Sequence, residues 1–98
     1  MILIGVLKMK KIQTIINKCS RSTGIHPDRI FDKKKTRSTV LSRQMAIYIL
    51  RKEGYKQNEL AEIFGLSVES IRYAERQINN IMSYKNQERK RIELIMSK

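Results

Sequence analysis

Two groups of side chains in this sequence have the types and spacing needed to bind a polyanion. The first is the run 32–38, which holds four cations and one acid and has no apolar residue. The second follows helical spacing opposite apolar positions and consists of Glu69, Arg72, Tyr73, Arg76 and Asn80. Side chains of these kinds hydrogen-bond phosphates and base edges, so we expect recognition of a nucleic acid.

The sequence shows no arrangement of side chains that is typical of a catalytic site or a metal-binding site. Cys19 is the single cysteine and His26 the single histidine, and nothing in the sequence orients one toward the other. Cys19 lies at an apolar position, which predicts a buried side chain, and His26 has no partner ligands. We therefore expect no enzyme, no cofactor and no metal site.

The charge balance favours a polyanionic partner. Lys and Arg number 21 against nine acids among 98 residues, a formal charge of +12. Such an excess favours nucleic acid first and an anionic membrane surface second. The apolar start, residues 1–7, is too short to span a bilayer and has no basic region ahead of it, so we expect no membrane partner and a cytoplasmic, nucleoid-associated protein of a bacterium or phage.

Hydrophobic spacing predicts an all-α fold, a small bundle of five to six helices without a sheet. The expected helices are about 8–21, a short helix opened by Pro27, then 42–53, 57–64, about 68–83 and about 86–96. Residues 32–38 are expected to form a solvated basic loop. We expect one domain at 9–98, preceded by an extension at 1–8 that either packs as a short strand or arm or leads in from upstream.

The stretch 59–71 has the pattern of a helix-turn-helix. Ala61 is small enough for two helices to cross closely, and Gly65 permits the backbone turn between them. Leu66 is expected to pack into the core below the turn, and Ser67 to cap the second helix. This arrangement presents the second helix outward, where a major groove is wide enough to receive it.

The last expected helix turns Ile92, Ile95 and Met96 inward. The same residues are also a candidate seam for a homodimer. In that case two recognition helices would lie about 34 Å apart over a pseudo-palindrome.

The run Arg43-Gln-Met-Ala46 after a basic segment, then Leu60 to Gly65 and Ala74 to Ile78, resembles a known family. It is similar to the C-terminal DNA-binding domain of the bacterial chromosomal replication initiator DnaA, of the Trp-repressor-like helical group. The resemblance covers about residues 9–97, and the Arg-Gln-Met-Ala run is its most specific part.

The resemblance implies roles for individual positions. The family's basic loop enters the minor groove, which implies that role for Lys35, with Lys34 and Arg37 nearby. Its Arg-Gln pair, here Arg43 and Gln44, contacts phosphates. Further backbone contacts are implied for Arg51, Gln57 and Asn58.

The recognition helix departs from the family. The family opens this helix with Asp-His-Thr-Thr, whereas this chain has Ser67-Val-Glu69-Ser70, which argues against recognition of the usual origin box. The chain also has no phosphate-binding loop of an ATPase. We expect a stand-alone relative that binds double-stranded DNA sequence-specifically, in replication or as a small transcriptional regulator. The alternatives are a basic protein-interaction adaptor and an RNA-binding module.

Overall fold

A computed structural model of the chain describes residues 2–31, 36–84 and 87–96, with side chains from Lys10 onward except Glu88. All elements in these ranges are helices, which confirms the predicted all-α class. They are α1 (Ile2–Thr23), α2 (Pro27–Ile30), α3 (Arg37–Lys52), α4 (Gln57–Phe64), α5 (Val68–Met82) and α6 (Gln87–Met96).

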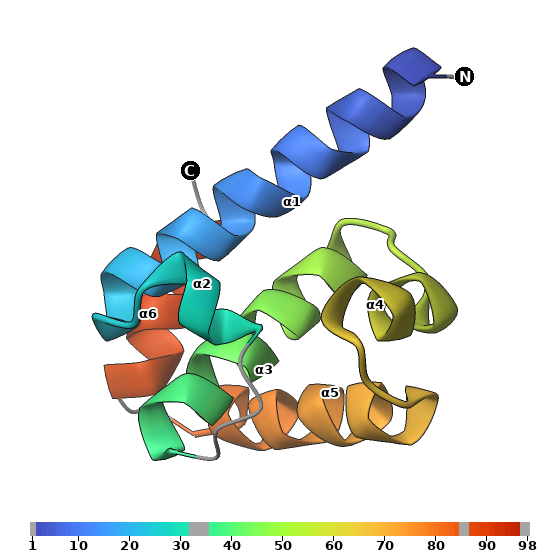
Figure 1. Cartoon of the computed structure of the whole chain (residues 1–98). Helices are drawn as coiled ribbons and strands as arrows, with labels where there is room; N and C mark the ends of the chain where they lie inside the picture. Colours follow the sequence, from blue (N-terminus) through green and yellow to red (C-terminus); the bar gives the residue numbers. More distant parts are fainter. Residues whose placement is uncertain (1, 32–35, 85–86, 97–98) are drawn as a thin grey trace.

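Helix α3 is the centre of the bundle. It packs against α1 on one side and α5 on the other, and α2 also contacts it. In Figure 1, α1 runs across the top of the molecule, α5 lies along the bottom, and α6 lies beside α1. The N-terminal half of α1 projects beyond the other helices (Figure 1).

The central position of α3 explains its burial. The sequence pattern predicts an inward face of Met45, Ala46, Ile49 and Leu50, and all four are buried. Burial also includes Ile47 and the ring of Tyr48, so residues 45–50 are buried without interruption. An amphipathic pattern places one face inward, whereas a helix packed on opposite sides buries more than one face.

The chain begins differently from the prediction. The first residues form neither a strand nor an irregular arm, because α1 is helical from Ile2. No proline occurs within α1, and the single Gly5 costs only about 1 kcal/mol of helix propensity. The helix is continuous across the predicted domain boundary between residues 8 and 9, which itself stays a prediction.

The predicted basic loop, residues 32–38, also ends earlier than expected. Helix α3 begins at Arg37, five residues before the predicted start, so Arg37 and Ser38 are helical. The Thr36 hydroxyl oxygen accepts a hydrogen bond from the Thr39 backbone N–H at 3.3 Å, which caps the earlier start. The predicted loop residues 32–35 lie outside the described part of the chain.

Helix α6 turns two of the three predicted residues toward the core. Ile92 is fully buried and Ile95 is partly buried, but Met96 is 39% exposed. The prediction that Met96 points inward is therefore wrong. The helix ends at this residue, which lines a surface hollow together with residues of α1 and α3.

Candidate nucleic-acid interface

Helices α4 and α5 form the predicted helix-turn-helix. Gly65 ends α4 in the left-handed region, with φ +65°, which glycine adopts without the usual steric cost. The Leu66 backbone N–H donates to the Ala61 carbonyl at 2.9 Å and closes the turn. Leu66 packs against the core from the turn, as predicted.

The start of α5 is capped in the predicted way. The Ser67 hydroxyl oxygen accepts a hydrogen bond from the Ser70 backbone N–H at 3.1 Å. Glu69 lies in the first turn, where the helix dipole favours an acid. Ser67, Glu69 and Ser70 are all exposed, so the end of α5 that would enter a groove is accessible.

The two faces of α5 separate as the sequence predicts. Ile71, Ala74 and Ile78 are buried against the other helices. The outward positions are exposed, and they are Arg72, Tyr73, Arg76 and Asn80. Tyr73 is 53% exposed, so its ring and hydroxyl are available to a ligand.

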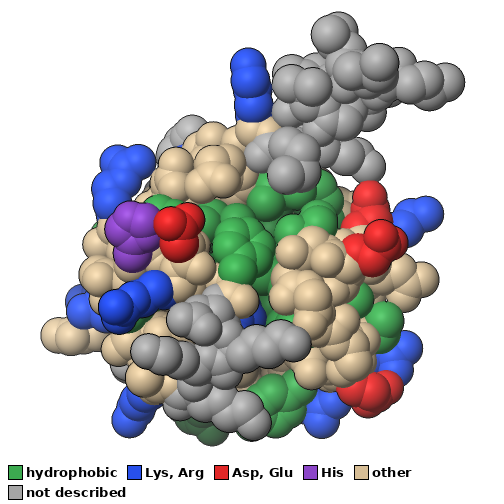
Figure 2. Space-filling model, viewed as in Figure 1, with side chains coloured by type: hydrophobic (Ala, Val, Ile, Leu, Met, Phe, Trp, Pro, Cys, Tyr) green, Lys and Arg blue, Asp and Glu red, His purple; other side chains and the backbone are tan. Residues whose placement is uncertain are grey.

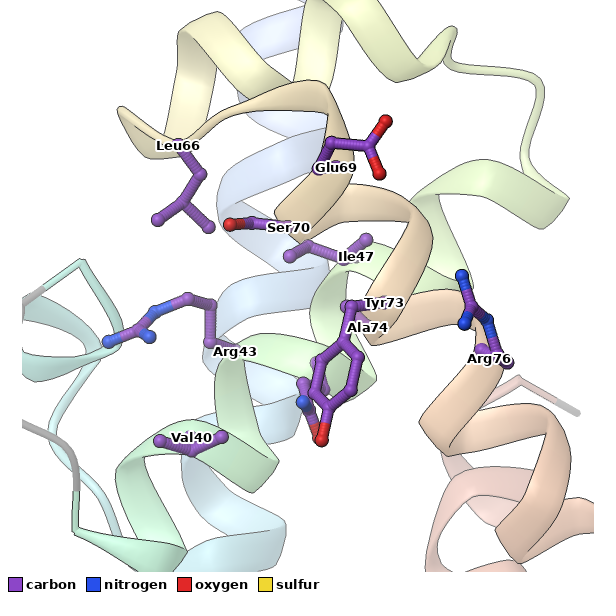
Figure 3. A pocket seen from close by; sticks show the side chains of 10 residues that line it. Val40, Arg43, Ile47, Leu66, Glu69, Ser70, Tyr73, Ala74 and Arg76 are labelled. Atoms are coloured by element: carbon purple, nitrogen blue, oxygen red, sulfur yellow. The ribbon is translucent and has the colours of Figure 1, made fainter.

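A groove of about 570 Å³ runs between α3 and α5. Six predicted site residues line it, from two helices that are well separated in the sequence: Arg43, Gln44, Glu69, Ser70, Tyr73 and Arg76. Figure 3 shows Tyr73 standing over the middle of this groove, with Arg43 and Arg76 toward its two sides. Its floor is apolar and includes Val40, Ile47 and Ala74.

A polar network behind this groove joins α3, α4 and α5. Glu75 of α5 is its central residue, with one carboxylate oxygen accepting from Arg51 Nε at 3.0 Å and the other from Gln57 Nε2 at 2.8 Å. Arg51 also donates to the Tyr55 backbone carbonyl at 2.9 Å. Glu75 is absent from the sequence-based site residues, because nothing local to α5 indicates that Arg51 and Gln57 converge on it.

The network extends to the outer face of α5 through Arg72. Its Nε donates to Gln57 Oε1 at 3.4 Å, and its Nη1 donates to Glu69 Oε1 at 3.0 Å. These contacts hold the guanidinium beside the start of the recognition helix. Arg72 remains exposed, so it keeps further donors for a ligand.

The other predicted contacts are distributed around the groove. Arg43 donates from Nε to the Ile30 carbonyl at 2.9 Å, so part of its function is to attach the end of α2 to α3. Arg37 is exposed at the first position of α3, and Asn58 is exposed in the first turn of α4. Lys34 and Lys35 lie outside the described residues.

The end of α2 is further connected to the helix-turn-helix. The Phe31 and Phe64 rings stack with centroids 5.3 Å apart, and Phe64 is the last residue of α4. On the face seen in Figure 2, hydrophobic side chains reach the surface between α2 and α4, and Lys and Arg lie around the edge. The stack thus places Phe31, the residue before the basic run 32–38, close to the turn before α5.

The described residues contain no cluster of three or more His, Cys, Asp or Glu side chains placed to hold a metal ion. In the same part of the chain, no helix is both long enough and apolar enough to cross a membrane. Burial raises the pKa of the Cys19 thiol to about 12.

These features define the class of protein: a helical DNA-binding domain of the helix-turn-helix type. Residues 12–78 match the family model described as the bacterial DnaA protein helix-turn-helix, and the chain belongs to this family. The match spans α2 to α4 in full, the C-terminal half of α1, most of α5, and the groove. No curated protein sequence matches the chain.

Proposed function

We propose that the chain binds double-stranded DNA sequence-specifically, with α5 in the major groove and the basic segment before α3 in the adjacent minor groove. The observation that supports this most directly is the groove between α3 and α5. It brings together polar and charged side chains of the kinds that hydrogen-bond base edges and phosphates, and α5 has the exposed polar face that a recognition helix needs.

The proposed roles follow from position and charge. The exposed side chains at the start and middle of α5 read base edges, and these are Ser67, Glu69, Ser70, Arg72, Tyr73 and Arg76. Backbone contacts come from Arg37, Arg43, Gln44 and Asn58, with Arg51 and Gln57 supporting them through Glu75. Lys34 and Lys35 enter the minor groove, where a narrow groove concentrates negative potential.

A salt titration tests duplex binding. Fluorescence anisotropy on a random duplex pool should show affinity that falls steeply with salt, by a slope of about 0.9 per neutralised phosphate. Arg37→Ala should weaken binding to the whole pool, whereas Lys90→Ala, which removes an exposed cation on α6 away from the groove, should change it little. An affinity that is flat across salt, or equal losses in both variants, would contradict the proposal.

Selection from a random duplex library tests sequence specificity. We expect an enriched motif, and we expect Arg72→Ala or Arg76→Ala to change the motif more than the bulk affinity. A pair of inverted half-sites would support the predicted homodimer. Stronger binding to structured RNA than to duplex DNA would instead favour the RNA-binding alternative.

The biological process is part of the same proposal. Membership of the DnaA family favours replication initiation, and transcription regulation requires only the same duplex binding. The recovered motif distinguishes them, because repeated copies near a replication origin would favour the first and single copies at promoters the second.

A further inference from the structure

The surface between α1 and α6 has two adjoining hollows. The larger is about 430 Å³ and is lined by Lys18, Arg21, Ser22, Arg91, Leu94 and Ile95. The smaller is about 270 Å³ and is lined by Lys11, Thr14, Ile15, Lys18, Ile49, Glu53, Ile95 and Met96. They share Lys18 and Ile95, so together they form one continuous seam.

The seam has the dimensions of a helix-binding site. Its α1 side runs from Lys11 to Ser22, with lining residues at three- and four-residue steps. At 1.5 Å per residue this stripe is roughly 16 Å long, or about three helical turns. Helix-in-groove recognition uses stretches of this length, with anchors at the same spacing.

The seam exposes aliphatic surface. Leu94 is 74% exposed and Met96 is 39% exposed, and the partly buried Ile95 lies between them in the sequence. The other large hydrophobic side chains exposed in the described part of the chain are aromatic. Leu94 lines the larger hollow, Met96 lines the smaller one, and Ile95 lines both. Exposed aliphatic side chains along one seam typically mark an interaction surface.

The charge of the larger hollow indicates what kind of partner fits. Arg21 and Arg91 are exposed on opposite sides of it, and the described residues that line it include no acid. In the smaller hollow, Glu53 is already paired with Lys11, with 2.6 Å between Oε1 and Nζ. A partner with carboxylates beside apolar anchors would therefore find both cations and an apolar floor.

Two other occupants fit less well. In a symmetric dimer the same patch faces itself, so Arg21 and Arg91 would meet identical cations on a chain of net charge +12. Duplex DNA gains little from exposed Leu94 and Met96, because phosphate contacts use polar donors. The proposed DNA-reading helix α5 also lies on the far side of α3 from α1 (Figure 1).

We propose that the α1–α6 seam docks an acidic amphipathic helix of a partner protein, and that this helix and duplex DNA bind the domain at the same time. The partner's apolar face covers Leu94, Ile95 and Met96, and its carboxylates pair with Arg21 and Arg91. Such a site would connect a DNA-bound domain to a second protein.

The test uses the full chain and a fluorescein-labelled amphipathic peptide of about five helical turns, with Leu on one face and Glu on the other. Anisotropy should report saturable binding, which Arg21→Glu with Arg91→Glu weakens by about tenfold or more. Arg29→Glu with Lys90→Glu, the same charge change at two exposed positions outside the seam, should alter affinity by less than about twofold. Leu94→Ser should also weaken binding, and circular dichroism checks that each variant is folded.

Two controls separate the seam from general charge attraction. A peptide of the same composition in scrambled order should bind at least about tenfold more weakly, because the apolar anchors no longer share one face. Excess duplex DNA should leave the ordered peptide bound. Equal binding of the scrambled peptide, or displacement by the duplex, would overturn the proposal whether or not the domain binds DNA.

Sedimentation of the chain alone tests whether a second copy of the chain occupies the seam. The seam overlaps the predicted homodimer surface at Ile95 and Met96, and this proposal assigns that surface to the acidic partner instead. We therefore expect that Leu94→Ser does not dissociate any dimer that the chain forms. A dimer that this substitution dissociates would assign the seam to a second copy of the chain and overturn the acidic partner.

Discussion

At the scale of single residues, Glu75 is a side chain whose contacts the sequence does not predict but whose role in the fold is central. Its two carboxylate oxygens accept from Arg51 and Gln57, which come from α3 and α4, and its side chain is only 21% exposed. Through these contacts Arg51 and Gln57 hold α5 against α3 and α4. Glu75 is therefore a positioning residue for the proposed interface.

We expect Glu75→Gln to destabilise the fold by about 1 kcal/mol, because a charge-assisted acceptor of two hydrogen bonds is replaced by an amide. Urea unfolding followed by circular dichroism measures this change. Glu62→Gln is the matched control, since Glu62 is an exposed acid on α4. DNA affinity should fall with Glu75→Gln and stay unchanged in the control. Equal stability of the two variants would show that the network contributes nothing.

At the scale of elements, the junction between α4 and α5 depends on one backbone conformation. Gly65 has φ +65°, and a Cβ placed there would meet no atom within 4 Å. The cost of a side chain at this position is therefore backbone strain without a steric clash.

We expect Gly65→Ala to lower the free energy of unfolding by about 1 kcal/mol, the usual cost of the left-handed region for an L-residue. Gly65→Asn should cost less, because asparagine tolerates that region. Denaturant unfolding of both variants compares them directly. If the asparagine variant were the less stable one, backbone strain would not be the reason for glycine here.

A second junction joins α1 to the end of α3 and depends on pH. The hydrogen bond and charge of Glu53 raise the pKa of Lys11 above its ordinary value of 10.5. A raised lysine pKa gives stability that is fully present below pH 10.5 and is lost as pH rises through the folded-state value.

The pair can be measured by a double-mutant cycle of Lys11→Gln and Glu53→Gln. The coupling between the two side chains should be measurable but small at about pH 8, since both are partly exposed. It should decrease as pH rises above 10.5 and through the raised pKa of Lys11. A coupling that is unchanged at the higher pH would contradict the assigned pKa shift.

At the scale of the whole molecule, one hydrophobic core joins all six helices. Residues of α1 pack on α3, α3 packs on α5, and Ile30 and Ile92 add the short and final helices to the same cluster. Cys19 is fully buried in this core. Its reactivity therefore reports opening of the bundle.

We expect native Cys19 to resist alkylation by iodoacetamide near neutral pH. The rise in its pKa from 9.0 to about 12 lowers the thiolate fraction about a thousandfold, and burial blocks access as well. Alkylation followed by mass spectrometry should become fast only in denaturant. Duplex DNA at saturating concentration should slow alkylation further, because a ligand that binds the native state stabilises it.

Much of this architecture is encoded locally. The spacing of Ile71, Ala74 and Ile78 predicts the inner face of α5, Gly65 predicts the turn, and Ser67 predicts the cap; the structure agrees at each position. These features depend on neighbours within a few residues, which sequence patterns report directly. The roles of Lys34 and Lys35 remain predictions, because they lie outside the described residues.

Other features required the tertiary structure. The convergence of Arg51 and Gln57 on Glu75, the six site residues gathered in the α3–α5 groove, and the α1–α6 seam all join segments that are distant in the sequence. The uninterrupted burial of residues 45–50 likewise depends on helices packing on opposite sides of α3. Periodicity indicates which face of a helix turns inward, but only packing decides which residues meet there.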